Sequence, residues 1–453
     1  MGLDFRIKDF AYPFAILKFK NQFDRDQWLD KEELYSYQLR RLKTILDHAS
    51  RNVPYYEKLF KKNNISPSDI KTTEDLKHLP YLDKDKLISN FDVLVSRDIK
   101  KYQPTLQKTS GTSGRQVMFC TDKPSNILEF VYYWRNWGWA GYRLGDKFAE
   151  LSAQYFTPYE VNGNRICQFN YLTRRLMVNS LMISLKNIGK YIAIFNKYKP
   201  LFLKGLPSNL YALALIFAAK KNYPVRFKAV FSQGENLLEY QRKLIERVFS
   251  CKVFDSYGLM ERVAAISECP QGNYHYHLDY SLIEFEKTDF DFGDELKEDE
   301  YIAEVIGTSL HNFSMPLIRY RTGDYVKIKN NDGTCSCKRN FPLVQAILGR
   351  SADIVITPDK RAITALYVAL DRTPGIIMGQ IIQERIDKLL VRIACDASEV
   401  DRINKEIKDN LRHFLGPDMK IEVVYQSVDE IREVNKSKFK SIISKVPYQE
   451  ILP

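Results

Sequence analysis

Apolar residues in the middle of the chain alternate between two spacings. Short, mostly apolar runs over 201–205 and 227–232 each lead into a turn, then into helical periodicity over 209–220 and 237–249. Residues 252–256 resume the strand pattern. Strands that alternate with helices of this length predict a largely parallel sheet.

The C-terminal part repeats this pattern on a smaller scale. A strand over 389–394, a helix over 398–415 that ends in Gly-Pro, and a strand over 420–425 predict a compact α+β unit. We therefore expect an α/β protein with two parts. Residues 1–348 form a large domain with mostly parallel sheets and flanking helices, and residues 349–453 form a small mobile α+β domain.

Near the start of the chain, 38–49 predicts an amphipathic helix, because Leu42, Ile45, Leu46 and Ala49 share one face. At 453 residues and 45% apolar content the chain is long enough for two or more cores. Its formal charge of +12 comes from cations interleaved with acids, which favours an anionic small ligand or acidic surface and disfavours nucleic acid.

The sequence shows neither a typical signal peptide nor a typical membrane-spanning segment. No window approaches 18 continuous apolar residues, and charged residues precede any apolar run, so we expect no transmembrane segment and a cytoplasmic protein. The aromatic stretch 10–17 leaves peripheral membrane contact open, although packing against the domain is the alternative. Seven cysteines disfavour a disulfide framework. The oligomeric state stays open.

One loop after Lys108 combines glycines, hydroxyls and flanking cations, which is typical of a phosphate-binding loop. The next segment, 117–120, is short enough to be the second arm of a hairpin around that loop. An ordinary Ser/Thr/Gly surface loop is the alternative. The candidate phosphate-binding residues are Thr109, Ser110, Gly111, Thr112, Ser113, Gly114 and Arg115.

Three further turns follow the predicted parallel strands, at Gly205, at Gly234 and Glu235, and at Tyr257 and Gly258. In open α/β sheets, ligands bind beyond the carboxyl ends of the strands. We therefore expect these turns to converge on one crevice.

Four segments resemble, in order, the core motifs of the adenylate-forming (acyl-activating) enzyme superfamily. They are 109–115, 257–261, 320–324 and 349–353. Three earlier segments, 46–49, 53–56 and 79–80, resemble more narrowly its phenylacetate–CoA ligase branch, including the CapK-type members of capsule biosynthesis. The similarity runs from about Gln38 to the end of the chain.

The resemblance implies a ligase in which a carboxylate attacks the α-phosphate of MgATP, pyrophosphate leaves, and a second nucleophile opens the acyl-adenylate. Ser110 and Thr112 would hold the β- and γ-phosphates, and Glu261 would hold Mg²⁺. Lys438, from the small domain, would bridge the carboxylate and the α-phosphate. Thr112, Glu261 and Lys438 are thus the catalytic candidates.

The same resemblance places Gly234, Glu235, Tyr257 and Gly258 around the adenine and Asp324 at the ribose hydroxyls, with Arg350 as a further nucleotide-binding residue. Three of the assigned residues have an ordinary alternative role. Tyr257 could be a core aromatic, Glu261 an acid at a helix N-terminus, and Asp324 a turn former.

Lys438 is chosen because an aromatic residue follows it, although Ser437 replaces the usual glycine before it. A solvated basic segment is the alternative, since Lys436 and Lys440 are also cationic. At the hinge, Ala352 replaces one member of the usual acidic pair, so the resemblance predicts adenylation and leaves thioester formation open.

Three cysteines and one histidine form a candidate structural zinc site, namely Cys269, His275, Cys335 and Cys337. Their arrangement between the second and fourth motifs resembles the zinc site of some phenylacetate–CoA ligase relatives. His277 competes with His275 as the nitrogen ligand. Four unconnected residues are the alternative.

The substrates expected are ATP and a carboxylic acid, whose pocket should lie among Trp134, Trp137, Phe231 and Ser256. The acid itself is left open. The acceptor is coenzyme A or a non-CoA nucleophile such as a sugar amine or hydroxyl. A catalytically degenerate ATP-binding scaffold is a second hypothesis, and a basic zinc-containing nucleic-acid binder is a third.

Overall fold

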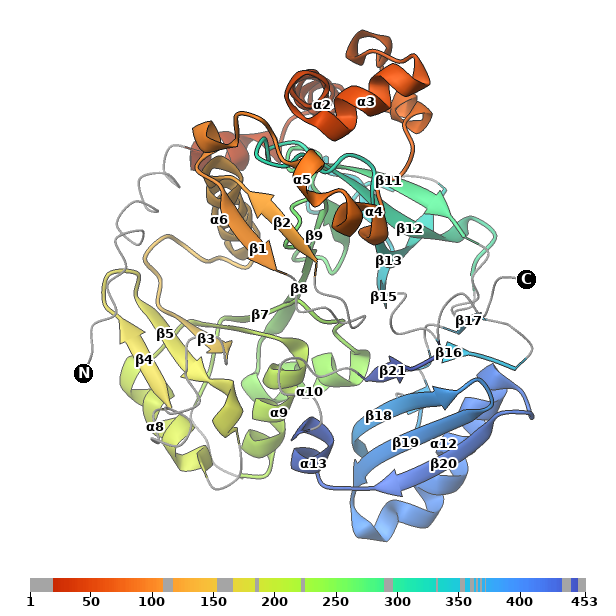
Figure 1. Ribbon diagram of the computed structural model, residues 1–453. Helices are drawn as coiled ribbons and strands as arrows, with labels where there is room; N and C mark the ends of the chain where they lie inside the picture. Colours follow the sequence, from red (N-terminus) through yellow and green to blue (C-terminus); the bar gives the residue numbers. More distant parts are fainter. Residues whose placement is uncertain are drawn as a thin grey trace.

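The computed structural model describes most of the chain (Figure 1). The described residues are 19–108, 117–152, 166–183, 187–220, 225–288, 296–330, 333–350, 355–358, 362–363, 366, 369–370, 372–433 and 441–446.

The central feature is a nine-stranded sheet with the order β14-β10-β9-β8-β7-β6-β3-β5-β4. Its five middle strands, β8 through β5 in that order, run parallel, and the strands on both flanks are antiparallel. Its strands are β3 (Phe148–Ser152), β4 (Cys167–Asn170), β5 (Arg175–Asn179), β6 (Phe202–Gly205), β7 (Ala229–Gln233), β8 (Lys252–Gly258), β9 (Ala265–Glu268), β10 (Tyr274–Tyr276) and β14 (Leu343–Val344).

Helices cover both faces of the parallel part. Alternate strand residues such as Leu203 and Val230 pack against α8 (Ile188–Tyr198), α9 (Pro207–Ala218) and α10 (Glu239–Phe249). The residues between them point to the other face, where Phe202 and Phe231 pack against Trp137. Trp137 lies on α6 (Lys123–Trp139). The predicted strand and helix alternation is confirmed, with boundaries shifted by about two residues as expected for frayed ends.

A second sheet is antiparallel, with the order β11-β12-β13-β15. The consecutive strands β11, β12 and β13 pair directly with their neighbours, as antiparallel strands can, and β15 pairs antiparallel with β13. The α/β class is thus confirmed, and this sheet is an addition that the sequence did not predict. Its strands are β11 (Ser281–Lys287), β12 (Glu300–Ser309), β13 (Tyr320–Lys329) and β15 (Ala346–Arg350).

The N-terminal helices pack on this second sheet (Figure 1). The predicted helix over 38–49 is the middle of α2, where Leu42, Ile45, Leu46 and Ala49 are buried as expected. The helical segments here are α2 (Lys31–Asn52), α3 (Pro54–Asn63), η1 (Pro67–Asp69), η2 (Glu74–His78), α4 (Lys84–Ser89), α5 (Phe91–Leu94) and η3 (Ile99–Tyr102).

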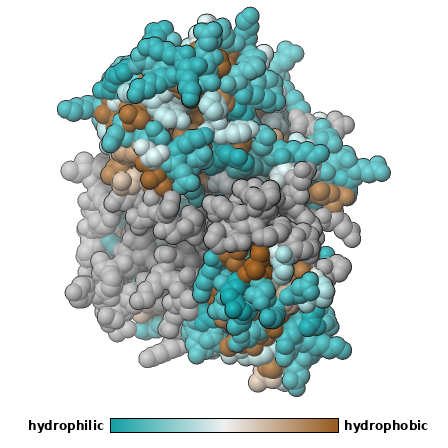
Figure 2. All heavy atoms as spheres, turned by 45° about the vertical axis from the view of Figure 1, so that its right-hand side comes forward, coloured by the Kyte–Doolittle hydropathy of each residue, from teal (hydrophilic) through white to brown (hydrophobic). Residues whose placement is uncertain are grey.

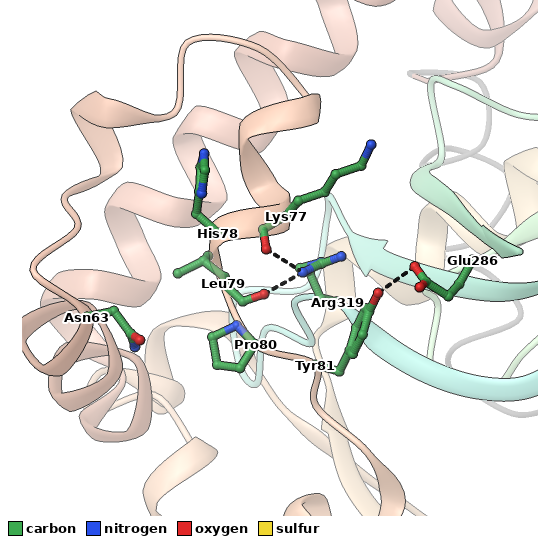
Figure 3. Close-up of a pocket in the computed structure, with 8 residues that line it drawn as sticks. All are labelled: Asn63, Lys77, His78, Leu79, Pro80, Tyr81, Glu286 and Arg319. Carbon is green, nitrogen blue, oxygen red and sulfur yellow. Dashed lines mark hydrogen bonds between the residues drawn. The ribbon is translucent and has the colours of Figure 1, made fainter.

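Arg319 holds these helices to the sheet. Its guanidinium donates to the carbonyl oxygens of Lys77 and Leu79 (Figure 3). It also forms an ion pair with Glu284 at 2.8 Å. The Tyr81 ring lies 4.3 Å from the same guanidinium. The surface hollow that Figure 3 shows therefore has its central cation already paired, so we assign it a structural role.

The C-terminal residues form a smaller mixed sheet, β20-β19-β18-β21, with its own apolar core. The predicted strands and helix over 389–425 are confirmed. The elements are β16 (Val355–Ile356), β17 (Ala362–Ile363), β18 (Ile376–Arg385), β19 (Lys388–Cys395), η7 (Ala397–Glu399), α12 (Val400–Leu415), β20 (Lys420–Tyr425), α13 (Val428–Glu433) and β21 (Ile442–Ser444). Tyr211 of α9 donates a hydrogen bond to the carbonyl of Ile377, which connects this part to the central one. The domain boundary at 348/349 stays a prediction.

Figure 2 shows a face on which hydrophilic residues predominate and apolar residues are scattered between them. None of the helices in the described ranges combines the length and the apolar character needed to cross a membrane.

Candidate active site

The carboxyl ends of β6, β7 and β8 lie side by side, because these strands are parallel neighbours. They end at Gly205, Gln233 and Gly258. Gly234, with a φ of 83°, turns the chain out of β7, a conformation that favours glycine. The three turns predicted to converge are therefore brought to one edge of the sheet.

Tyr257 and Asp324 contact each other at this edge. The Tyr257 hydroxyl donates to Asp324 Oδ2 over 2.6 Å, although 67 positions separate the two residues. Asp324 lies on β13 and is 2% exposed. Its backbone N–H donates to Thr322 Oγ1, which itself donates to the Val305 carbonyl. Asp324 is therefore a strand residue held from several sides, and the alternative that it merely forms a turn is wrong.

The hinge motif lies against the same two segments. Gly349 and Arg350 pair with Tyr325 and Asp324 across β15 and β13. Gly349 has a φ of 109°, and a Cβ at this position would overlap the side-chain nitrogen of Asn236, which follows the Gly234 turn. Only glycine allows this approach without strain. The loop after β7, the third motif and the fourth motif thus meet.

Glu261 lies in the turn between β8 and β9 and is 6% exposed. It does not begin a helix, so that alternative is wrong. Next to it, Arg262 has a φ of 61° and forms an ion pair with Glu129 of α6 at 2.5 Å. Tyr280 also donates to Glu129. This buried network fixes the turn that carries Glu261.

Several predicted residues fall outside the described part of the chain. They include Lys438, Ala352 and the whole phosphate-binding loop from Thr109 to Arg115. The two arms of the loop are described, as β1 (Thr105–Lys108) and β2 (Met118–Thr121), and they pair antiparallel with Lys108 opposite Met118. The predicted hairpin is confirmed, while the conformation of its loop stays a prediction.

The aromatic residues predicted to line the acid pocket are part of the core. Trp137 and Phe231 stack with their ring centroids 5.4 Å apart, and both are less than 10% exposed. Tight stacking leaves no room between these two rings, so the pair supports the sheet and helix rather than opening a pocket.

Two charged residues of this sheet face were not predicted. Glu150 and Lys204 are register partners on β3 and β6, with Lys204 Nζ 3.3 Å from Glu150 Oε1. Lys204 precedes Gly205 and lies over the rings of Tyr133 and Trp137. Burial acts to raise the pKa of Glu150, but Lys204 and Arg175 outweigh it and lower that pKa. The Glu150–Lys204 ion pair therefore lies one residue before the carboxyl end of β6, where the crevice begins.

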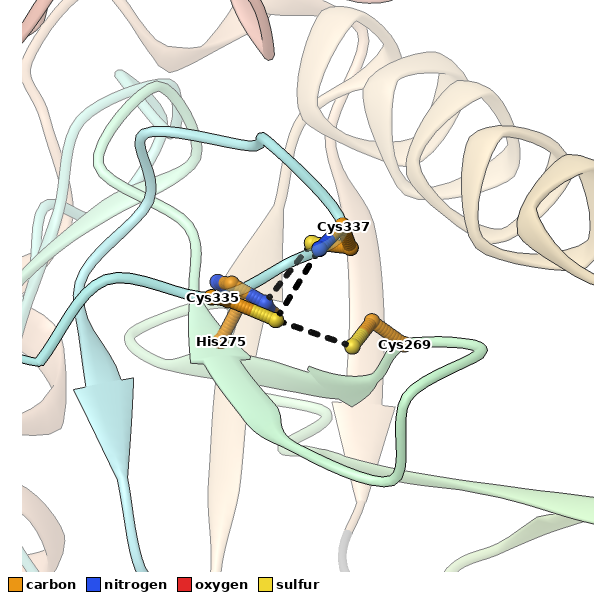
Figure 4. A group of neighbouring side chains, drawn as sticks. All are labelled: Cys269, His275, Cys335 and Cys337. Carbon is orange, nitrogen blue, oxygen red and sulfur yellow. Dashed lines mark hydrogen bonds between the residues drawn. The ribbon is translucent and has the colours of Figure 1, made fainter.

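The predicted metal ligands form one cluster (Figure 4). The ligand atoms of Cys269, His275, Cys335 and Cys337 all lie within 4.8 Å of one another. Cys269 and Cys335 sulfurs are 3.6 Å apart, and Cys337 Sγ lies 3.3 Å from His275 Nε2. Tetrahedral zinc with ordinary bond lengths needs edges of about 3.8 Å and 3.5 Å for these two pairs. The donor set and its spacing therefore fit zinc.

Hydrogen bonds orient the ligands. His275 Nδ1 lies 2.7 Å from the Phe341 carbonyl, which fixes the proton there and turns the Nε2 lone pair toward the sulfurs. Burial lowers the pKa of His275 to about 4, so the imidazole is neutral, as a ligand must be. The Asn273 amide lies 3.3 Å from Cys335 Sγ and can donate to it.

His277 belongs to another network. Its Nδ1 accepts from Arg135, which also forms a buried ion pair with Asp279, and its ring stacks on Trp139. The histidine of the cluster is therefore His275.

Comparison with known proteins agrees with this geometry. The CapK C-terminal domain family matches residues 355–445. Protein CapK of Staphylococcus aureus is 24% identical over 393 residues, which cover 85% of this chain and 84% of that protein. Over most of its length the chain is similar to CapK and to phenylacetate–CoA ligases, which are adenylate-forming enzymes.

Two further proteins extend the comparison. A phenylacetate–coenzyme A ligase of Thermus thermophilus is 23% identical over 332 residues, 72% of this chain and 73% of that protein. The crystal structure of a 2-hydroxyisobutyryl-CoA ligase with a bound acyl-adenylate has a TM-score of 0.69 and 19% identity, and covers 93% of this chain and 91% of that one. The chain thus shares the fold of that ligase over nearly its whole length.

Proposed function

We propose that this protein activates a carboxylic acid with ATP. A carboxylate oxygen attacks the α-phosphorus, the bond between the α-phosphorus and the bridging oxygen breaks, and pyrophosphate leaves, so that an acyl-adenylate remains. The observation that carries the proposal is the meeting of Tyr257, Asp324 and the Gly349–Arg350 segment at the carboxyl ends of the parallel strands. Residues from three family motifs converge there.

The residue roles follow from this placement. Tyr257 offers a ring face to the adenine beside the Gly234–Glu235 turn, and Asp324 offers a carboxylate to the ribose hydroxyls. Glu261 would hold Mg²⁺, which neutralises phosphate charge when bound. Catalysis is then mainly positioning and charge neutralisation.

Two elements outside the described residues complete the proposal. The loop from Thr109 to Arg115 would bind the β- and γ-phosphates through its backbone and hydroxyls, and the hairpin β1–β2 holds its two ends. Lys438 would bridge the carboxylate and the α-phosphate. It precedes β21, which pairs with β18 of the C-terminal sheet.

The relatives support the adenylation step more directly than they support any one acyl acceptor. The ligases among them transfer to coenzyme A, whereas the CapK similarity and Ala352 at the hinge support an amine or hydroxyl of a polysaccharide pathway. We propose the second acceptor class. Mass analysis of the product formed with coenzyme A, amino sugars or glycans compares them, and a coenzyme A thioester as the sole product would overturn this choice.

We also propose that Cys269, His275, Cys335 and Cys337 bind one structural zinc ion. All four positions of a tetrahedral ion would be filled by protein, which leaves none for a reaction. Metal analysis of the purified protein should find about one zinc per chain, and less than half of that amount would end the zinc assignment.

Acid-dependent exchange of pyrophosphate into ATP tests the adenylation. We expect exchange with at least one member of a broad acid panel. ATP binding without exchange for any acid would instead support the scaffold hypothesis. Tight, strongly salt-dependent binding of nucleic acid without exchange would support the third hypothesis.

A further inference from the structure

The amino ends of the five parallel strands lie at the edge of the central sheet opposite to the crevice. A cation stands at the start of each strand or within three residues before it. These cations are Arg174 before β5, Lys147 before β3, Lys199 before β6, Lys228 before β7 and Lys252 at the start of β8. Neighbouring strands are about 4.8 Å apart, so the row spans roughly 19 Å.

Backbone hydrogen bonds show that this row is continuous. The N–H of Phe148 donates to the Arg174 carbonyl, and the N–H of Leu201 donates to the Lys147 carbonyl over 2.8 Å. The N–H of Lys228 then donates to the Leu201 carbonyl over 2.7 Å. The cations are therefore fixed by the sheet itself rather than gathered from separate loops.

Negative charge is scarce at this edge. Asp146 accepts a hydrogen bond from the backbone N–H of Arg143. Glu246 of α10 accepts from the N–H of Val253, next to Lys252, and also forms an ion pair with Arg242 at 3.8 Å. No ion pair between described residues involves Arg143, Lys147, Arg174, Lys199 or Lys228. We name the row of five cations together with Arg143 the basic edge.

Apolar side chains project beside the basic edge. Tyr171 is 58% exposed, Leu172 is 43% exposed and Leu144 is 40% exposed. Tyr171 and Leu172 lie in the turn between β4 and β5, the strands at the left-hand side of the sheet in Figure 1. The Arg174 guanidinium donates to the Gly145 carbonyl over 3.1 Å, which joins this turn to the one that carries Leu144.

We propose that the basic edge docks the protein on an anionic lipid bilayer, with Leu144, Tyr171 and Leu172 entering the headgroup region. Cations near an anionic membrane surface each contribute about 1 kcal/mol, and exposed tyrosine and leucine gain by burial at the interface. A nucleic acid would also bind the cations, but it would not bury Leu144 and Leu172. Because the crevice lies at the other end of the strands, the docked protein keeps it open to solution.

Co-sedimentation of the full chain with vesicles tests this docking. One set of vesicles contains phosphatidylcholine alone, and the other an equal mixture with phosphatidylglycerol. We expect binding to the anionic vesicles at about 0.1 M salt, weaker binding at about 1 M salt, where the screening length falls to roughly 3 Å, and none to neutral vesicles.

Two triple variants locate the interaction. Arg143→Glu, Lys147→Glu and Lys228→Glu should together weaken binding at least tenfold. These positions are chosen because Arg174 and Lys199 have positive φ values and would add backbone strain. Lys43→Glu, Lys62→Glu and Lys405→Glu change the net charge equally at exposed positions elsewhere and should retain most binding. Melting temperatures confirm folding of both.

Equal loss of binding in both triple variants would overturn the proposal, because net charge alone would then account for the attraction. Leu172→Ser combined with Tyr171→Ser should weaken vesicle binding about threefold to tenfold, while binding of a short DNA duplex should be unchanged. If the duplex binds as tightly as the anionic vesicles and the double variant alters neither, the edge is a polyanion surface and the membrane assignment is wrong. Adenylation is measured separately, so these outcomes leave it untouched.

Discussion

The cysteine–histidine cluster and the proposed nucleotide crevice are both built from distant segments, yet the cluster is closed by four protein ligands and the crevice is open. The cluster places four ligand atoms within 4.8 Å of one another and orients them with hydrogen bonds from their own loops. The crevice places Tyr257, near the carboxyl end of β8, beside Asp324 of β13, has Glu261 in the turn after β8, and depends on two segments outside the described residues. A closed site with every position filled stabilises structure, whereas an open one leaves room for reactants.

This difference predicts that variants of the two regions separate stability from catalysis. The largest expected effect is on stability. Cys335→Ser should reduce bound zinc to less than half an equivalent and lower the melting temperature by at least about 5 °C, because metal binding contributes directly to folding free energy. Cys395→Ser, a cysteine outside the cluster, should change neither. Full zinc content in Cys335→Ser would contradict the ligand assignment.

Lys438→Ala should leave the melting temperature unchanged and reduce acid-dependent pyrophosphate exchange about 100-fold or more, as loss of one group that stabilises developing charge does. Lys436→Ala is the matched control, since it removes a neighbouring charge and should lose less than about threefold. A greater loss in Lys436→Ala would show that the chosen register of this basic segment is wrong.

Gly349→Ala should destabilise the protein by about 2 kcal/mol, because the new methyl group meets Asn236 in a backbone conformation that disfavours side chains. Chemical denaturation measures the loss. Adding Asn236→Ala should restore part of the stability by removing the overlap, while the backbone strain persists. No recovery in the double variant would show that the two residues do not contact each other in this way.

The smallest effect is expected for Tyr257→Phe, which keeps the ring but removes the hydroxyl that donates to Asp324. Loss of that hydrogen bond should raise the KM for ATP about fivefold to tenfold. Tyr257→Ala should raise it further, because the stacking face is also lost. Equal effects of the two changes would argue against a stacking role for the ring.

The elements of the fold were largely predictable. The β6–α9–β7–α10–β8 sequence follows from apolar spacing, and the same holds for α12 and its neighbouring strands. The antiparallel sheet was harder to predict, because β12 is almost wholly buried and therefore lacks the alternation of apolar and polar residues that marks a half-exposed strand. The hydrophobic pattern within one strand also does not show which other strand it pairs with.

The site was predictable in its residue types and less so in its contacts. The bond between Tyr257 and Asp324 depends on how two sheets meet. Glu150 and Lys204 are single charges in apolar runs, and only the strand register makes them partners. His275 and His277 stand two residues apart, a spacing that puts both on one side of a strand, so sequence alone could not choose between them.

Isotope transfer tests the proposed adenylation most directly. An acid that supports exchange is labelled with ¹⁸O in its carboxylate and incubated with ATP, an acceptor and the protein, and the recovered AMP is analysed by mass spectrometry. Attack of the carboxylate on the α-phosphorus predicts AMP that carries one labelled oxygen, together with pyrophosphate. Formation of ADP and phosphate, or of AMP without label, would contradict the account.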